Sequence, residues 1–513
     1  MPDNSFSSTD TLPDDVAVLQ KMVSERDSTI ERLKHEVLLL RQWRFGRKSE
    51  KLEASGQLSL FPGGPAVEAE KEEAPAAKSA KKGHGRKPIP ANLPVERIEI
   101  DVPADELVCT PCGSDKIRIG EETRRELDYI PGSILVREYV RPVYACPNEC
   151  EGQVVVAANP SSPIEKGLPG AGLLAHVATS KYADHIPLNR MEGILRRHGV
   201  DIRRSTMADW MAYGAHLLTT FHGEMKRRAL LSTVIHTDDT PVTVQDPKGK
   251  SKPHTGRLWV YSGDRHNPYD VYEYSPDRKR EHPHGVLSGW KGFLQADAYQ
   301  GYNALYDGDI VEIACWAHAR RKFVEAEKSD RRAAGMLGLV QKLYRVEKRV
   351  KSVCQRLGWS FDSPGKDGDL AEEFRRRRRE KQSVPILSAI GDWLRGPECS
   401  TALPKSPLGE AAGYCLNNWQ ALNEYARRGN LSIDNNAAER KLRPVAVGRK
   451  NYLFFGSDNG GRTAAIMYSV ISSAKRHGLD PWRYLRDVFS RLPDMTVSQL
   501  PELLPDKWRD SHQ

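Results

Sequence analysis

The chain has 513 residues, of which 28% are charged and 39% apolar, and its 77 Lys and Arg residues outnumber the 68 Asp and Glu residues to give a net charge of +9. This length exceeds one ordinary domain, since domains span roughly 100–200 residues. No stretch approaches the roughly 18 apolar residues of a membrane span, and residues 1–15 are polar and acidic, unlike a secretory signal. We therefore expect a multidomain cytoplasmic protein, and the modest basic excess suits a nucleic-acid partner.

Residues 1–45 are predicted to form a coiled coil. Apolar residues recur at alternating spacings of three and four from Val16 to Leu40, with Arg26 as a polar exception. Such heptads are typical of a zipper that pairs two copies of a chain. The alternative is a single amphipathic helix packed on its own protein. The pattern thus predicts a homo-oligomer.

Residues 46–98 are predicted to form a linker. They are basic at both ends and rich in Ala, Pro and Glu between, a composition that cannot support a core. The basic end, Lys81–Pro88, loosely resembles a Gly-Arg-Pro element that lies in a DNA minor groove. A solvated tether is the alternative to DNA contact.

Residues 99–160 are predicted to form a zinc-ribbon domain. Cys109 and Cys112 form one close pair, and Cys146 and Cys150 form a second pair with a slightly longer spacing. In a reducing compartment cysteines indicate a metal site or core thiols rather than disulfides, and four thiolates fit one tetrahedral zinc ion. No open ligand position is evident, so we expect one structural Zn²⁺. Four unligated thiols are the alternative.

Residues 161–230 are predicted to be helical. A helix, a short turn at His198–Val200 and a second helix with Ser205 as its expected N-cap are typical of a helix-turn-helix. The segment could therefore bind DNA, and plain helical packing is the alternative. Basic residues cluster around the turn, namely Arg196, Arg197, Arg203 and Arg204.

A run of strands begins at Val234. A short helix is expected near 278–288, and another helix begins near His318. The elements of a ribonuclease-H-like sheet follow this order: three consecutive strands, a helix, a strand, a helix and a strand. Asp238 would then lie on the first strand and Asp297 at the end of the fourth, adjacent in the sheet. The predicted strands are Val234–Val244, Arg257–Tyr261, Asp270–Tyr274, Gly292–Asp297 and Ile310–Cys315.

Such a carboxylate pair suits phosphoryl transfer, which uses two divalent ions about 3.5–4 Å apart. Carboxylates are the hard oxygen ligands that magnesium prefers. Glu439, at the start of a predicted helix, is the best candidate for a third ligand, and Arg440, Lys441 and Arg443 after it suit phosphates.

Structural alternatives exist for each acid. Asp238 and Asp239 are neighbours that point to opposite faces of a strand, so the pattern alone does not choose between them. Asp297 could form a turn. Asn436 and Glu439 fit a capping box, in which Glu439 would only start a helix.

The sequence resembles the DDE transposases of the insertion-sequence family IS66 across nearly its whole length. The resemblance rests on several phrases in the right order, besides the two cysteine pairs. They are Phe-Gly-Arg-Lys-Ser-Glu-Lys at 45–51, Asp-Asp-Thr-Pro at 238–241, Gln-Ala-Asp-Ala-Tyr-Gln-Gly-Tyr at 295–302, Cys-Trp-Ala-His-Ala-Arg-Arg-Lys-Phe at 315–323, Asp-Asn-Asn-Ala-Ala-Glu-Arg at 434–440 and Gly-Arg-Lys-Asn-Tyr-Leu-Phe-Phe-Gly-Ser at 448–457.

This resemblance implies a metal-binding triad of Asp238, Asp297 and Glu439, two Mg²⁺ or Mn²⁺ ions, and accessory proteins encoded beside the gene. It also implies that 324–410 is a helical insertion. The chain departs from the family at Asp239, where Glu is usual, and in its lengthened second cysteine pair. The expected fold is multidomain α+β, with a ribonuclease-H-like catalytic domain formed by 231–323 and 411–490, and a C-terminal tail at 491–513.

Basic residues near the triad are candidates for DNA contact. His318 could lie near the scissile phosphate or be a core imidazole. Five consecutive arginines, Arg375–Arg379, are expected to form a solvated helix face, with DNA contact as the alternative. The further candidates are Arg320, Arg321, Arg440, Arg443, Arg449 and Lys450.

The predicted function is that of a nucleoid-associated bacterial transposase with no membrane partner. It would bind the ends of its element, cut DNA by water attack and join the freed 3′ hydroxyl to target DNA. The alternatives are a non-catalytic zinc-bearing DNA-binding protein derived from a transposase, and a ribonuclease-H-like nuclease without strand transfer.

Overall fold

The computed structural model describes residues 132, 134–139, 143–145, 154–156, 161–164, 167–245, 252–306 and 308–512. The predicted coiled coil and linker lie outside these residues, as do Cys109, Cys112, Cys146 and Cys150. Within the predicted zinc ribbon, β1 (Val143–Ala145) pairs with β2 (Val154–Val156) in an antiparallel arrangement.

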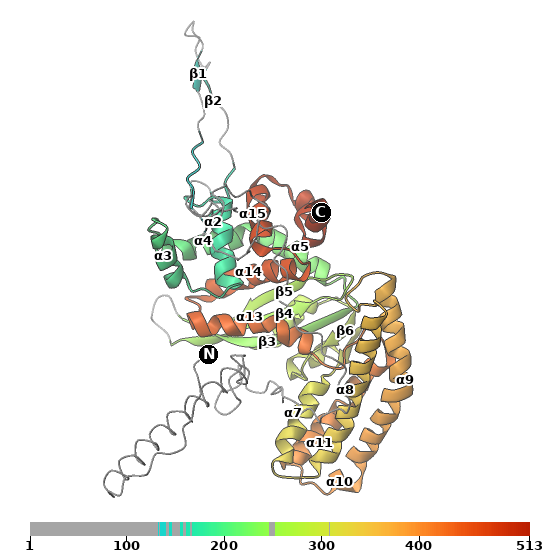
Figure 1. Ribbon diagram of the computed structural model, residues 1–513. Helices are drawn as coiled ribbons and strands as arrows, with labels where there is room; N and C mark the ends of the chain where they lie inside the picture. Colours follow the sequence, from blue (N-terminus) through green and yellow to red (C-terminus); the bar gives the residue numbers. More distant parts are fainter. Residues whose placement is uncertain are drawn as a thin grey trace, which may run out of the picture. The chain divides into compact units, whose positions relative to one another are not determined.

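A five-stranded mixed sheet lies at the centre of the described chain (Figure 1). Its strands have the order β5-β4-β3-β6-β7, in which β3, β4 and β5 are antiparallel and β6 and β7 run parallel to β3. All five predicted strands are present, although β6 ends two residues before Asp297. Their bounds are β3 Val234–Val244, β4 His254–Ser262, β5 Asp270–Ser275, β6 Gly292–Gln295 and β7 Ile310–Ile313.

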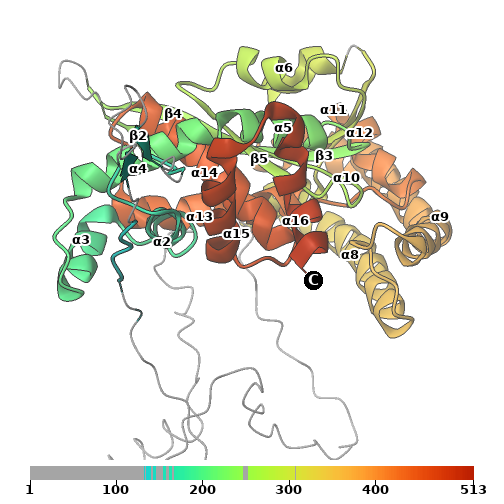
Figure 2. The same ribbon diagram turned by 90° about the horizontal axis from the view of Figure 1, so that it is seen from above.

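The two faces of the sheet belong to different cores. On β4, Leu258 and Val260 pack into the larger core, whereas Trp259 and Tyr261 pack into a smaller one. This alternation follows from the two-residue period of a strand. Helices α5 (Thr219–Ala229), α13 (Asn436–Tyr452) and α14 (Asp458–Arg476) cover the first face, and α6 (Glu281–Leu287) and the 3-10 helix η2 (Gln300–Leu305) cover the second (Figure 2).

A buried ionic network holds α13 and α14 onto the first face. Asp270 on β5 is fully buried and pairs with Lys441 of α13 at 2.6 Å and with Arg476 of α14 at 3.0 Å. Burial opposes ionisation of Asp270, but these cations outweigh it and lower its pKa to about 2. The layer that carries Glu439 is therefore fixed to the sheet by charge as well as by apolar packing.

A second helical layer packs on the outer side of α14. The expected helical pair is present as α3 (Leu188–Arg197) and α4 (Arg204–Leu217), and Gly199 between them has φ +80°. The predicted N-cap at Ser205 is wrong, because α4 begins one residue earlier and its first N–H donates to the Glu192 carboxylate at 3.1 Å. The other members of the layer are α2 (Ala171–Tyr182), α15 (Pro481–Arg491), the 3-10 helices η4 (Leu492–Asp494) and η5 (Val497–Leu503), and α16 (Pro505–His512).

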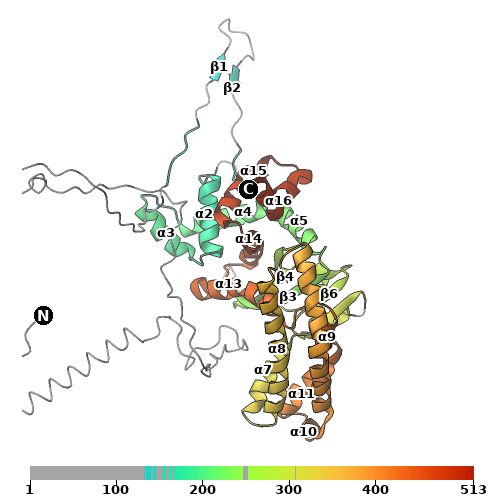
Figure 3. The same ribbon diagram turned by 45° about the vertical axis from the view of Figure 1, so that its right-hand side comes forward.

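A helical bundle shares a core with the β7 edge of the sheet. Val234 and Ile313 of the sheet pack in one cluster with Met336 and Ile390 of the bundle. Figure 3 shows the two long helices α8 and α9 side by side, reaching away from the sheet. None of the helices in the described ranges is long and apolar enough to cross a bilayer. The bundle consists of α7 (Trp316–Glu327), α8 (Ala333–Arg356), α9 (Lys366–Arg395), α10 (Pro397–Ser400), α11 (Pro407–Asn417), α12 (Trp419–Glu424) and the 3-10 helix η3 (Tyr425–Arg427).

Candidate active site

Asp238 and Asp239 of β3 face opposite sides of the sheet. Asp238 is in register with Val260, which packs into the core beneath α13, and Asp239 is in register with Trp259 of the other core. Residues directly opposite each other in an antiparallel pair share a face. Asp238 therefore faces the layer of α13, the helix that carries Glu439.

Asp239 is neutralised by two arginines. Its carboxylate accepts from Arg257 Nη1 at 2.9 Å and from Arg278 Nη2 at 2.8 Å, and its side chain is only 2% exposed. Arg278 also stacks on the Tyr299 ring, 4.1 Å from its centroid, and lies 3.6 Å from the Asp297 carboxylate. Asp239 thus has a structural role, and Arg278 links it to Asp297.

The three predicted ligands interact electrostatically. Burial raises the pKa of Asp238 well above its ordinary value, and the negative charges of Asp297, Asp239 and Glu439 raise it further. Burial also raises the pKa of Asp297, against the opposing charge of Arg278, and the pKa of Glu439, against that of Arg321. In the β3–β6 register His236 pairs with Gln295, so Asp297, two residues beyond β6, lies near Asp238, and Glu439 lies within electrostatic range of both.

His318 lies next to Glu439. Its Nε2 is 3.8 Å from Glu439 Oε1. Burial, with help from the charges of Arg321 and Lys322, lowers the pKa of His318 to about 4, so the ring is neutral at neutral pH. In the described part of the chain, Glu439 Oε1, His318 Nδ1 and Arg321 Nε are buried without a hydrogen-bond partner. Buried polar atoms are nearly always hydrogen-bonded, so this cluster is suited to receive a ligand.

Asn435 fixes the start of α13 against β3. Its fully buried side chain donates to the Thr237 carbonyl at 2.8 Å and contacts His236 Nδ1 at 3.2 Å. Its backbone N–H contacts Cys315 Sγ at 3.2 Å. The capping-box alternative for Glu439 is wrong: Asn435 is the N-cap, and its side chain is occupied by β3 instead of capping the helix.

The segment before Asn435 joins the other elements that carry site residues. Gln295 of β6 donates from Nε2 to the Ser432 carbonyl at 2.8 Å. The Trp316 N–H, at the start of α7, donates to the Ile433 carbonyl at 3.1 Å. Asp434 accepts from the Tyr344 hydroxyl of α8 at 3.1 Å. Asp297, His318 and Glu439 are thus positioned through one short stretch of chain.

Two residues of the five-arginine run of α9 hold the chain just before this stretch instead of facing solvent. Arg379 is 0% exposed and forms a two-bond ion pair with Glu347 of α8 at 2.7 and 2.9 Å. It also donates to the Tyr425, Arg428 and Leu431 carbonyls at 2.7, 2.7 and 2.9 Å. Arg375 donates to the Gly429 carbonyl at 3.0 Å. The expected solvated face is therefore wrong for these two residues, which face inward one helical turn apart.

The basic candidates for DNA contact fall into two groups. Arg440, Arg443 and Lys450 are exposed, and their spacing of three and seven residues places them on one face of α13. Arg449 instead donates to Thr240 Oγ1 on β3 at 2.9 Å. Arg320 and Arg321 are half-buried on α7.

The carboxylates of Asp238, Asp297 and Glu439 suit hard divalent ions, although they are not close enough together to form a complete metal site. Carboxylate oxygens are the ligands that magnesium prefers, and a cation would relieve the repulsion that raises the pKa of Asp238. Across residues 167–245, 252–306 and 308–512, however, no three His, Cys, Asp or Glu side chains are close enough to hold an ion. Metal binding would therefore require these side chains to move closer.

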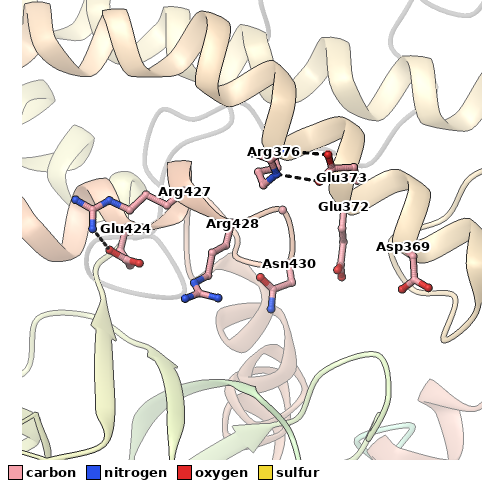
Figure 4. A pocket seen from close by; sticks show the side chains of 9 residues that line it. Asp369, Glu372, Glu373, Arg376, Glu424, Arg427, Arg428 and Asn430 are labelled. Atoms are coloured by element: carbon pink, nitrogen blue, oxygen red, sulfur yellow. Dashed lines mark hydrogen bonds and ion pairs between the residues drawn. The ribbon is translucent and has the colours of Figure 1, made fainter.

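A surface pocket between α9 and the chain near η3 is lined by none of these three acids. Figure 4 shows acidic and basic side chains around it, with Arg376 bonded to Glu373 and Arg427 bonded to Glu424. Its charges largely neutralise one another, so it is a weak candidate for a functional site.

Family models match nearly the whole chain. The model described as Transposase IS66 family matches residues 166–463, and the IS66 C-terminal element matches 469–505. The zinc-finger binding domain of transposase IS66 matches 106–151, which includes the four paired cysteines, and a model described as Transposase C of IS166 homeodomain matches 32–98.

Similar proteins occur in Sinorhizobium fredii. The uncharacterized protein y4hP is 32% identical over 83% of this chain and 77% of its own length, and y4qI is 31% identical over 96% and 91%. A third, y4jD, is 28% identical over 97% of both chains. These matches, with a model that covers more than half of the sequence, show that the chain belongs to the IS66 transposase family.

Proposed function

We propose that this chain is a catalytically active DNA transposase. It would bind the ends of an insertion sequence, cleave the DNA and transfer the 3′ hydroxyl end to target DNA. The observation that carries this proposal is the electrostatic convergence of Asp238, Asp297 and Glu439 from β3, the end of β6 and α13. A protein that only binds DNA gains nothing from three partly buried acids that repel one another.

Asp238, Asp297 and Glu439 would hold two Mg²⁺ or Mn²⁺ ions in a ribonuclease-H-like fold. Such ions supply an activated attacking oxygen and a stabilised leaving oxygen. Arg278, held by Asp239 and Tyr299, would orient the Asp297 carboxylate. The neutral His318 would accept or donate a hydrogen bond near the scissile phosphate.

Positive charge would bind the DNA around this centre. Arg321 would neutralise a phosphate there, which is supported by its buried nitrogen without a hydrogen-bond partner among the described residues and by its electrostatic interaction with Asp297 and Glu439. The exposed face of α13 that bears Arg440, Arg443 and Lys450 would contact the DNA phosphate backbone farther from the acids.

The remaining parts would organise the assembly. Cys109, Cys112, Cys146 and Cys150 would hold one structural Zn²⁺, and residues 1–45 would pair two copies of the chain. Accessory proteins of the same element would assist, and the complex would act at the bacterial nucleoid in the cytoplasm.

Cleavage of DNA that carries the element's ends tests this proposal. Wild-type protein should cut only with added Mg²⁺ or Mn²⁺, and Asp297→Ala should bind but not cut. Cutting that persists in excess chelator would contradict the metal-dependent scheme. Binding without cutting in the wild type would indicate a non-catalytic binder, and cutting without joining would indicate a nuclease.

A further inference from the structure

Two large apolar side chains are exposed to solvent just after α13. Leu453 is 65% exposed and Phe454 is 43% exposed. Single exposed apolar residues are ordinary on protein surfaces. These two residues are adjacent, and they directly follow α13, the helix that carries Glu439 in its first turn. The contacts that keep them exposed at this position therefore bear on the function of the site.

Leu453 has a strained backbone. It adopts φ 61° and ψ −43°, and the Phe454 N–H donates to the Tyr452 carbonyl at 2.6 Å. This is a three-residue γ-turn with positive φ, which is rare and strained for a residue with a Cβ. Such strain persists only where the surrounding structure imposes it, and it concentrates at functional sites.

The residues on either side of the pair are anchored. Tyr452 is hydrogen-bonded through its hydroxyl to that of Tyr468 and lies against the Phe455 ring, with centroids 6.3 Å apart. Phe455 is buried, and its backbone bonds to Thr243 at 2.9 Å and Gln245 at 2.8 Å, at the end of β3. The exposed pair therefore lies between two anchored residues, one of which is bonded to the end of β3, the strand that carries Asp238.

The surroundings of the pair favour a polyanion. Lys450 is exposed one helical turn before Leu453, Arg443 is exposed farther back on α13, and Arg462 is exposed on α14. Glu439 and Leu453 are 14 residues apart in sequence, which at the rise of an α-helix is about 21 Å. That separation corresponds to about six base-pair steps of duplex DNA.

We propose that Leu453 and Phe454 form an apolar wedge that inserts between stacked base pairs of the bound DNA, about six base pairs from the phosphate held near Glu439. Apolar side chains flanked by cations unstack and kink duplexes in this way. The wedge would open the DNA end next to the cleavage centre. This inference rests on the proposed function and assigns a second contact to the same DNA.

Fluorescence of 2-aminopurine tests the wedge. The probe base is placed in turn at positions near that distance from the cleavage site, in a duplex carrying the terminal inverted repeat that flanks the coding region. Binding of the full-length wild type should raise the fluorescence at one step. Leu453→Gly combined with Phe454→Ser should abolish the rise, whereas the matched control Leu357→Ser, at a position that is 54% exposed on the end of α8, should retain it.

Cleavage provides the second readout. The double variant should cut the intact duplex at least about tenfold more slowly, and a duplex mismatched at the probed step should restore its rate, because mispaired bases cost less to unstack. Leu453→Gly alone should melt no lower than the wild type, since glycine tolerates positive φ.

Unchanged fluorescence and unchanged cleavage in the double variant would overturn the wedge while leaving the proposed function intact. A fall in oligomeric mass of the double variant in sedimentation would also overturn it, because the pair would then be a contact between protein copies. A wild type that binds no DNA would overturn both proposals.

Discussion

Asp238 and Asp239 are adjacent in sequence but have opposite electrostatic environments. Asp239 lies between two guanidinium groups, so its charge is compensated within the fold. Asp238 has other acids nearby, and among the residues that the structure describes only the Asp239 backbone N–H, at 2.8 Å, hydrogen-bonds to its carboxylate and favours the charged form. An uncompensated buried carboxylate destabilises a protein unless a cation or ligand completes the site. Asp238 is therefore the acid of this pair that indicates function.

Replacement of this carboxylate should separate stability from activity. The pKa of Asp238 is raised by burial and by neighbouring acids, so between the ordinary Asp pKa and this raised pKa the folded chain binds more protons than the unfolded chain. The free energy of unfolding therefore falls as pH rises from the ordinary Asp pKa through the raised one. Asp238→Asn should raise the melting temperature of the metal-free protein at pH 7 and reduce cleavage by about 1000-fold or more, since a metal ligand supplies several kcal/mol of transition-state stabilisation.

Thermal melts at pH 4 and pH 7, with the metal removed by chelator, check this prediction. The gap between Asp238→Asn and wild type should be larger at pH 7. Asp239→Asn is the matched control, and it should lower the melting temperature because Arg257 and Arg278 lose their partner. Equal melting temperatures of Asp238→Asn and wild type at both pH values would contradict the assigned burial.

The acids of the candidate site were predictable from the sequence, but the residues that hold them in position were not. Acid types, strand texture and family phrases were enough to predict Asp238, Asp297 and Glu439. The strand pattern alone did not choose between Asp238 and Asp239; the family phrase selected Asp238, and the register of β3 with β4 shows that the two side chains face opposite sides of the sheet. Asn435 and Arg278 were missed because their roles depend on partners far away in sequence, such as Thr237 and Asp297.

At the scale of elements, α9 shows why a run of one residue type is hard to interpret. Residues four apart on a helix share a face, so Arg375 and Arg379 point inward together while Arg377 points to solvent. Whether such a run is solvated depends on what packs against each face. Here Glu347 of α8 and the carbonyls of 425–431 meet the inward face.

Loss of the Arg379 side chain should loosen the start of α13. Breaking one partner of a buried ion pair costs about 3–5 kcal/mol, and Arg379→Met also leaves three carbonyls without their donor. We expect a comparable fall in the free energy of unfolding in denaturant titrations and faster amide exchange over 428–440. Arg377→Met, on the exposed face, should change the free energy by less than about 1 kcal/mol. Equal effects of the two variants would contradict the supporting role of Arg379.

At the scale of the whole molecule, the order of the five strands followed from the sequence pattern, whereas the helical character of 324–410 was implied only by the family resemblance. The five strands were predictable because alternation of apolar and polar residues is a local signal. The packing of the helical bundle on the β7 edge was not, since Val234, Ile313 and Met336 meet across long stretches of chain.

Zinc content tests the predicted ribbon. Purified protein should contain about one zinc per chain if the paired cysteines form a four-thiolate site. Cys109→Ser with Cys112→Ser should remove it, and Cys354→Ala, at a buried cysteine of α8, should not. A folded wild type free of zinc would contradict this prediction.

Deletion of residues 1–45 tests the predicted zipper. The truncated chain should sediment at a lower oligomeric mass than the full-length protein, because the heptads between Val16 and Leu40 would be absent. An unchanged mass would place the interface elsewhere.

The most direct test of the central claim is single-turnover cleavage by Glu439→Gln, with DNA binding and melting temperature measured in parallel. Glutamine preserves the shape of the side chain, and Glu439 makes no capping bond that would be lost. A neutral amide is a far poorer ligand for a hard divalent ion. We predict wild-type folding and binding with cleavage reduced by about 1000-fold or more, while the control Glu325→Gln, at an exposed position on α7, cuts normally. Cleavage by Glu439→Gln at near the wild-type rate would contradict the assignment of Asp238, Asp297 and Glu439 as the catalytic triad.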